Sequence, residues 1–314
     1  ALLHSDHKRK RVVLPTYAFQ RKSYWIDIPT EGAQQKLYER TTDVGNVLGK
    51  ITHAKVLKTT VFETIFSAET IQYCREHKVF GEIVIPGAGH LAMFLEAIKS
   101  KLGRYQCTLS DIVFPSVLMI GPKEKVEVQL TITESNDSYG MNLISSLAND
   151  EFITHASCKM HAPGSVASLV DLKSLRNLIS DEIAVTLFYN GFENRKIELG
   201  NSFRCVEKLW HSKNQALAKI RVPENTLQTG DWELQPGVID SCIQILMAVI
   251  PLNFEETLVP FGIESLQYFG KNNTIELWSH FQLTSTSNDG MISGDVTIMD
   301  EHSNLICLIK GFKV

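Results

Sequence analysis

The chain has 314 residues, of which 44% are apolar and 21% charged, and its formal net charge is -4. This length allows one large core or two smaller ones. The weakly acidic balance argues against a nucleic-acid partner, and no apolar run reaches the roughly 18 to 20 residues that a membrane-spanning helix needs. Because the first residues also lack the apolar stretch of a secretory signal, we expect a cytoplasmic protein.

The cysteines and histidines form no metal-binding pattern. Neither a CxxC pair nor an HExxH motif occurs, so we expect no zinc ribbon, no disulfide framework and no catalytic metal. The thiols are expected to be reduced and mostly buried as small apolar groups. The six cysteines are Cys74, Cys107, Cys158, Cys205, Cys242 and Cys307.

Residues 1–44 are predicted to form an extended arm. The segment opens with a Lys/Arg run and continues with aromatic residues between Tyr17 and Trp25, without helical or strand periodicity. Exposed aromatic side chains need a surface to cover. The arm is therefore expected to pack on this chain or on a neighbouring domain.

Residues 45–162 are predicted to form a first structural half. In the stretch "HKVFGEIVIPGAGHLAMFLEA", His77, Gly81 and Pro86 stand in front of an apolar run that continues with helical spacing to Leu102. Little of this run is polar, so the helix is expected to be buried. His90 lies within it and is interpreted as a helix-packing residue.

Antiparallel strands are predicted to follow this helix. Residues 125–135 alternate apolar and polar side chains without a fault, and residues 151–162 alternate less cleanly. The next segment, residues 163–182, is rich in small residues and then in charged ones, which is typical of a linker.

Residues 183–314 are predicted to form a second half that repeats the first. Pro236 and the glycine after it again open an apolar helix, and strands are predicted over residues 273–286 and 294–312. Asp240 and Gln244 share one face of this helix, where an unpartnered carboxylate would be costly. The pattern indicates an α+β fold in which antiparallel sheets surround two helices, one in each half.

The residues alone leave two interpretations of His77 and Asp240. His77 is either a structural residue at a strand end or a base beside a helix start whose free N–H groups would polarise a carbonyl. Asp240 is either a favourable charge near a helix N-terminus or an acid. Because His77 and Asp240 come from equivalent positions of two repeated halves, the catalytic interpretation is favoured for both residues.

The chain resembles the dehydratase domains of modular type I polyketide synthases over nearly its whole length. His77, Gly81 and Pro86 match the family motif HxxxGxxxxP, and Asp240 and Gln244 match its DxxxQ motif. The segment "LPTYAFQRKSYW" is similar to the linker that follows the acyltransferase domain in such synthases, and "ELGNSFRCVEKLW" resembles the family's YGPxF segment.

The sequence departs from the family pattern at four positions. Leu199 stands where tyrosine is commoner, and Asn201 replaces the proline of YGPxF. Gln235 replaces the histidine of the family's HPxxxD pattern, and Ala18 replaces a linker proline. His77 and Asp240 are both retained, so we expect an active domain with an altered pocket wall.

The resemblance implies a double hot-dog fold and the dehydration of a 3-hydroxyacyl thioester to the 2-enoyl thioester during polyketide biosynthesis. His77 would be the base and Asp240 the acid, with Gln244 holding the carboxyl of Asp240. N–H groups near Val79 to Gly81, or at Gly87, would polarise the thioester carbonyl. Candidates for the walls of the substrate tunnel are Val79, Leu199, Gly200, Phe203 and Pro236.

The resemblance also implies the molecules that this domain meets. The substrate would arrive on the phosphopantetheine arm of an acyl carrier protein, no further cofactor would be required, and neighbouring synthase domains and a second copy of the chain would be partners. Two alternatives stay open: a double-bond-shifting isomerase or a cyclase on the same fold, and a non-catalytic module that docks the carrier protein.

Overall fold

The computed structural model describes most of the chain after the arm. It covers residues 39–43, 47–71, 75–103, 106–146, 151–164, 170–222, 232–250, 254, 256–270, 274–287 and 290–314. The aromatic residues of the predicted arm and Cys74 lie outside the described residues. Residues 38–314 form one compact unit.

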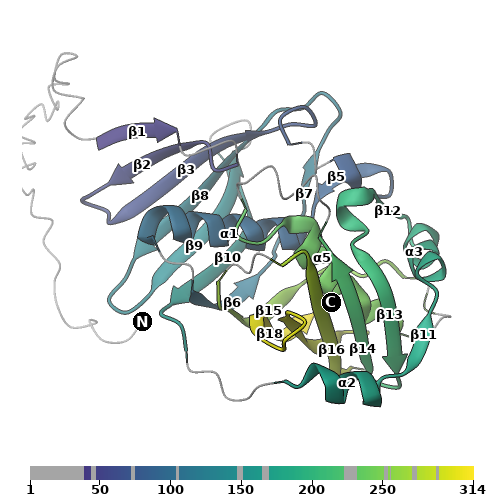
Figure 1. Cartoon of the computed structure of the whole chain (residues 1–314). Coiled ribbons are helices and arrows are strands. Elements are labelled where there is room, and N and C mark those ends of the chain that lie inside the picture. Colours follow the sequence, from purple (N-terminus) through teal and green to yellow (C-terminus); the bar gives the residue numbers. More distant parts are fainter. Residues whose placement is uncertain are drawn as a thin grey trace, which may run out of the picture. The chain divides into compact units, whose positions relative to one another are not determined.

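The described residues contain a fourteen-stranded antiparallel sheet (Figure 1). Seven neighbouring strands come from the first half and seven from the second. In spatial order, the first seven are β1 (Glu39–Asp43), β2 (Lys50–Ala54), β3 (Thr59–Phe66), β8 (Val126–Glu134), β9 (Tyr139–Ser146), β10 (Phe152–His161) and β6 (Cys107–Val113). The second seven are β15 (Gly262–Tyr268), β18 (Leu305–Lys313), β17 (Ile292–Met299), β16 (Glu276–Thr286), β14 (Gln215–Arg221), β13 (Val206–Ser212) and β11 (Asp181–Ile183).

The sheets of the two halves are joined edge to edge. Strands β6 and β15 pair along their whole length, with Leu109 opposite Leu266 and Cys107 opposite Tyr268. These four residues are buried, and the apolar residues of both halves form one continuous core. The sequence predicted a separate sheet in each half and gave no sign of this joint.

Two buried helices lie against the sheet, as predicted. Helix α1 (Gly87–Leu102) packs on β8, and α5 (Pro236–Gln244) packs on β14, β16 and β17 (Figure 1). The two helices also contact each other. Pro236 is the first residue of α5 as expected, whereas Pro86 precedes α1 as its N-cap, and the chain continues beyond α5 as the 3-10 helix η4 (Ile245–Ala248).

A buried polar joint connects α1 to the residues that lead into α5. Lys99 Nζ lies 2.8 Å from Glu233 Oε1, and the Tyr268 hydroxyl donates to the Glu233 carbonyl oxygen at 3.1 Å. The Glu233 N–H also donates to the Glu96 carboxylate. Both glutamates are buried, so the pairing with Lys99 offsets much of the cost of removing their charge from water.

A smaller sheet combines strands of both halves. Its order is β12 (Ile197–Leu199), β4 (His77–Val79), β5 (Glu82–Ile85) and β7 (Leu118–Ile120). In the pairing of β4 with β12, His77 stands opposite Leu199. The strand that carries the predicted base is therefore attached directly to the second half.

The predicted strands are confirmed, whereas most of the other strands and several helical elements of the described residues were not predicted. In β8, Val128, Leu130 and Ile132 are buried while Glu127, Gln129 and Thr133 are exposed, as the alternation indicated. The segment interpreted as a linker contains α2 (Leu172–Leu178), and the second half also contains α3 (Val185–Asn194) and the 3-10 helix η3 (Asn201–Phe203).

Asp171 caps α2 by accepting from the N–H groups of Lys173 and Ser174, at 3.1 Å and 3.2 Å. A charged stretch that looked like a linker is therefore a capped helix. Strand β1 likewise falls inside the range assigned to the arm. The exact domain boundaries otherwise stay a prediction.

The described residues bear on the expectations for thiols, membrane-spanning helices and metal sites. Five cysteines are buried and free, and burial raises the pKa of the Cys107 thiol to about 12. In the described part of the chain, no helix has both the length and the apolar character required to cross a membrane. Within the same residues, no three His, Cys, Asp or Glu side chains are grouped as a metal site would need.

Candidate active site

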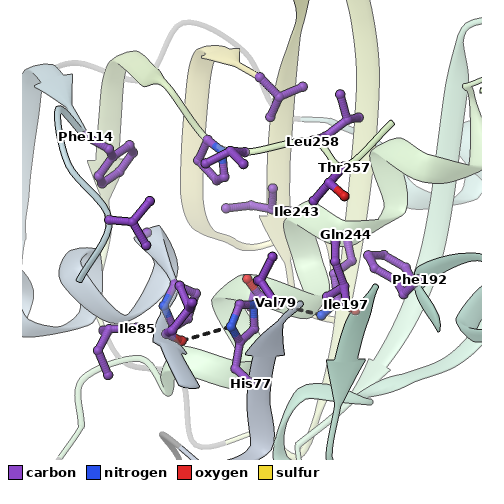
Figure 2. Close-up of a pocket in the computed structure, with 18 of the residues that line it drawn as sticks. His77, Val79, Ile85, Phe114, Phe192, Ile197, Ile243, Gln244, Thr257 and Leu258 are labelled. Atoms are coloured by element: carbon purple, nitrogen blue, oxygen red, sulfur yellow. Dashed lines mark hydrogen bonds between the residues drawn. The ribbon is translucent and has the colours of Figure 1, made fainter. Parts of the chain in front are cut away.

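A cavity of about 140 Å³ lies among residues of both halves (Figure 2). His77, Val79 and Gly87 line it from the first half, and Leu199 and Asp240 line it from the second. A cavity of similar volume in an engineered apolar core holds one benzene molecule. The space is therefore large enough for roughly six carbon atoms of a bound acyl chain.

His77 is held by its backbone neighbours in an orientation suited to a base. Its side chain is buried on β4, and Nδ1 lies 2.9 Å from the carbonyl oxygen of Val84 on β5 (Figure 2). Because a carbonyl oxygen can only accept, Nδ1 carries the proton and Nε2 keeps its lone pair. The Phe203 ring packs against the imidazole with ring centroids 5.3 Å apart.

Gly81 shapes the turn that follows His77. Val79 pairs with Glu82, so Phe80 and Gly81 form a two-residue hairpin loop, with φ values of 55° and 83°. Such a loop requires positive φ at both positions, which glycine adopts freely and phenylalanine rarely does. Gly81 is absent from the cavity lining, and the Phe80 N–H donates to the Lys196 carbonyl oxygen at 2.8 Å. Of the two predicted sources of carbonyl-polarising N–H groups, this turn is the weaker.

The start of α1 lies at the cavity. Pro86 and Gly87 both line it, and the first N–H groups of a helix have no acceptor within the helix. A Cβ atom at Gly87 would lie 3.3 Å from the Phe114 ring, so a larger residue would crowd this wall. The positive end of the helix dipole is therefore available to an oxygen atom bound in the cavity.

Asp240 occupies the wall formed by α5 and is held by Gln244. The Gln244 side-chain amide donates to Asp240 Oδ2 at 2.5 Å (Figure 2). It also donates to the Phe203 carbonyl oxygen at 3.0 Å. Burial raises the pKa of the Asp240 carboxyl above its ordinary value, and the nearby His77 imidazole and the Gln244 hydrogen bond oppose that rise. A carboxyl in this environment is more easily kept protonated than one in water.

Three predicted tunnel residues lie behind the cavity wall. Val79 and Leu199 line the cavity, whereas Gly200, Phe203 and Pro236 do not. Gly200 packs against the Glu76 side chain, and Phe203 is buried between His77 and the amide of Gln244. Gly200 and Phe203 therefore pack behind the residues that line the cavity.

Several lining residues were not predicted. Phe192 from α3 and Ile197 from β12 reach the cavity, as do a loop near Thr257 and the C-terminal residues Phe312 and Val314. These positions are distant in sequence and, apart from Thr257, carry ordinary apolar side chains. A single sequence contains no signal that would have found them.

His90 lines the cavity from α1, although we predicted only helix packing. Its side chain is buried, and neither ring nitrogen has a hydrogen-bond partner among the described residues. Burial, with the neighbouring His155 as a smaller cause, lowers the pKa of His90 to about 3. The imidazole is therefore neutral near physiological pH.

Family models match both halves of the chain. The model described as "Polyketide synthase dehydratase domain" matches residues 46–146, and the one described as "Polyketide synthase dehydratase N-terminal domain" matches residues 169–314. Among curated proteins, the polyketide synthases PksN and PksM of Bacillus subtilis (strain 168) are 24% and 26% identical over 98% of this chain. The chain spans only 6% and 8% of their lengths.

Solved structures resemble the described fold over most of its length. The dehydratase domain from the CurJ module of curacin polyketide synthase is 27% identical, with a TM-score of 0.79, over 85% of this chain and 96% of that one. An inactive CurJ dehydratase variant, with phenylalanine in place of a histidine and a compound bound, is 26% identical with a TM-score of 0.81 over 87% and 96% of the two chains.

Proposed function

The chain belongs to the polyketide synthase dehydratase family, a group of hydro-lyases, and we propose that His77 and Asp240 are its catalytic pair. Its substrate would be a 3-hydroxyacyl thioester, and its product the 2-enoyl thioester. The observation that carries this proposal is the shared cavity: a buried histidine from one half and a carboxyl from the other line the same apolar space.

The histidine would act as the general base. With Nδ1–H donated to Val84, Nε2 of His77 is the atom that accepts the proton from C2 of the substrate. The N–H of Gly87 at the start of α1 would hold the thioester oxygen and make that proton more acidic. The inactive histidine variant of the CurJ dehydratase is consistent with this assignment.

The aspartate would act as the general acid. As the C2–H bond breaks, its electron pair forms the C2–C3 double bond and the C3–O bond breaks. Asp240 gives its proton to the departing hydroxyl, which leaves as water. The raised pKa that burial gives the Asp240 carboxyl supports this role, because the acid must be protonated at the start of each turnover. Afterwards the proton on His77 must return to Asp240 or to solvent.

The partners follow from the relatives. PksN and PksM are far longer than this chain, so neighbouring synthase domains accompany the homologous segment there. We propose that an acyl carrier protein delivers the substrate on its phosphopantetheine arm, that the domain works as a dimer and that the reaction uses no other cofactor. A proton and a hydroxyl are all that this elimination moves, and the two side chains supply both transfers.

An isomerase or a cyclase on the same fold is the nearest alternative. The presence of Asp240 and its contact with Gln244 favour dehydration, because an acid beside C3 is needed to expel a hydroxyl. A docking module without catalysis would have no use for a half-buried carboxyl in an apolar cavity. Neither alternative has an observation in its favour.

The proposed function is tested by following elimination of water from carrier-bound 3-hydroxyacyl substrates by intact mass spectrometry. We expect turnover by the wild type, and a loss of at least about 1,000-fold for His77→Ala and Asp240→Asn. His302→Asn, on an exposed turn, is the matched control and should retain full activity. Full activity of His77→Ala would contradict the assignment. Migration of the double bond in a separately supplied 2-enoyl substrate, without loss of water from the 3-hydroxyacyl substrate, would support the isomerase.

A further inference from the structure

Glu76, the residue before His77, makes two contacts with the second half. Its carboxylate oxygen Oε2 accepts a hydrogen bond from the Ser202 N–H at 2.7 Å. Its backbone carbonyl oxygen accepts one from the Gly200 N–H, also at 2.7 Å. Glu76 is partly buried and is absent from the cavity lining, so it has no direct route to a bound substrate.

These contacts secure the short 3-10 helix η3, and η3 in turn supports the acid. Ser202 is followed by Phe203, whose carbonyl oxygen accepts from Gln244 Nε2 at 3.0 Å and from Ser241 Oγ at 3.1 Å. The same Gln244 amide donates to Asp240. A continuous series of contacts therefore runs from Glu76 through η3 to the carboxyl of Asp240.

The fit around η3 is close on two sides. A Cβ atom at Gly200 would lie 2.7 Å from Glu76 Oε2 and 2.8 Å from its Cβ, so only glycine leaves room for this carboxylate. On the other side, a Cβ atom at Gly237 of α5 would lie 1.8 Å from the Ser202 carbonyl oxygen. The turn is held between the strand that carries the base and the helix that carries the acid.

From this arrangement we infer that Glu76 is a positioning residue that fixes η3 and thereby orients Gln244 and Asp240. A carboxylate bonded to a backbone N–H is among the stronger hydrogen bonds in proteins, and here it joins elements of different halves. The inference rests on the proposed dehydration, because Asp240 matters only if its proton is used. It assigns to the first half a part in orienting the acid as well as in carrying the base.

The test measures kcat and KM for a carrier-bound 3-hydroxyacyl substrate, with thermal unfolding of each variant. Glu76→Ala should lower kcat by about tenfold and change KM by less than twofold, because the acid is misplaced while the binding walls remain. Glu76→Gln should stay within threefold of wild type, since its amide oxygen can accept from the same N–H. Glu82→Ala, which removes an exposed carboxylate from the adjacent strand, should match wild type.

Combined variants separate positioning from a general loss of structure. Because Glu76 acts through Gln244, Glu76→Ala should lower kcat by less than threefold when added to Gln244→Met. If Glu76→Ala does not fold, Glu76→Met, which keeps the volume but cannot accept a hydrogen bond, takes its place.

Three outcomes would overturn the inference and leave the proposed function intact. The first is wild-type turnover together with an unchanged kcat in Glu76→Ala, and the second is an equal loss in Glu76→Gln and Glu76→Ala. The third is a fully multiplicative effect of Glu76→Ala and Gln244→Met. Absence of turnover by the wild type would instead refute the proposed function, and with it the role of Glu76.

Discussion

The proposed base and the proposed acid are held in different ways. His77 is fixed mainly by the backbone, through the Val84 carbonyl oxygen and through two strands that pair with β4. Asp240 is fixed by a side chain, the amide of Gln244, which in turn depends on the Phe203 carbonyl oxygen. Single substitutions should therefore disturb the orientation of the acid more readily than that of the base.

The largest effect is expected where α5 meets η3. In Gly237→Ala the new Cβ atom would lie 1.8 Å from the Ser202 carbonyl oxygen, and backbone cannot move aside as a side chain can. We expect a loss of roughly 2 to 4 kcal/mol in the free energy of unfolding, measured by urea denaturation. Gly140→Ala, a strand position with no atom within 4 Å, is the control. Equal free energies of unfolding in the two variants would show that α5 and η3, the elements around Asp240, tolerate displacement.

His90 gives the part of the core next to the proposed base a pH-dependent stability. The pKa of His90 in the folded state, about 3, lies below the ordinary 6.5. Between these two pH values the unfolded chain binds a proton that the folded chain does not bind. Stability should fall as pH drops below 6.5, by about 2 kcal/mol between pH 7 and pH 5. Urea denaturation of His90→Leu should lack this component. An unchanged pH dependence in that variant would locate the titrating group elsewhere.

The acid itself should respond to Gln244. In Gln244→Met the hydrogen bond to the ionised carboxyl is lost, so the pKa of Asp240 should rise further. Since the acid works when protonated, the alkaline limb of the kcat/KM profile should move to higher pH. Misorientation should lower kcat by about tenfold, equivalent to about 1.4 kcal/mol. Movement of the limb to lower pH would contradict the acid role of Asp240.

The smallest effect is expected at the hairpin beside the base. Phe80 is exposed and adopts a positive φ that glycine adopts without strain. Phe80→Gly should therefore raise the free energy of unfolding by up to about 1 kcal/mol, or leave it unchanged, with full activity. Gly81→Ala, with a φ of 83°, should lower it by about 1 to 2 kcal/mol. A large loss of activity in Phe80→Gly would mean that the strained turn orients His77.

The sequence could single out the candidate catalytic residues because they stand out from their surroundings. A carboxylate in the apolar helix α5 and a histidine before a Pro-Gly helix can be recognised from the sequence alone. The supporting contacts are not visible, because they depend on which backbone atoms meet. Glu76 reaches Ser202 across 126 positions, and nothing in either segment marks the other.

Two further segments have local sequence patterns that do not match their structure. Small and charged residues between the halves are typical of a linker, yet Asp171 there caps a helix by accepting from two N–H groups. No strand was predicted at β6 or β15, because each is only seven residues long and its alternation is interrupted, in β6 by the exposed Asp111 and in β15 by two adjacent buried residues, Gly262 and Ile263. The helix and strands repeated in each half indicated the fold class, whereas the pairing of β6 with β15 is visible only in the three-dimensional structure.

The pairing of β6 with β15 has a consequence for how the domain unfolds. If either half opened alone, it would leave an unpaired strand edge and an apolar surface on the half that remained. Both losses make partial unfolding unfavourable, so the two halves should melt together in a single cooperative transition. The two halves are therefore similar in structure, but they unfold as one unit with a single free energy of unfolding.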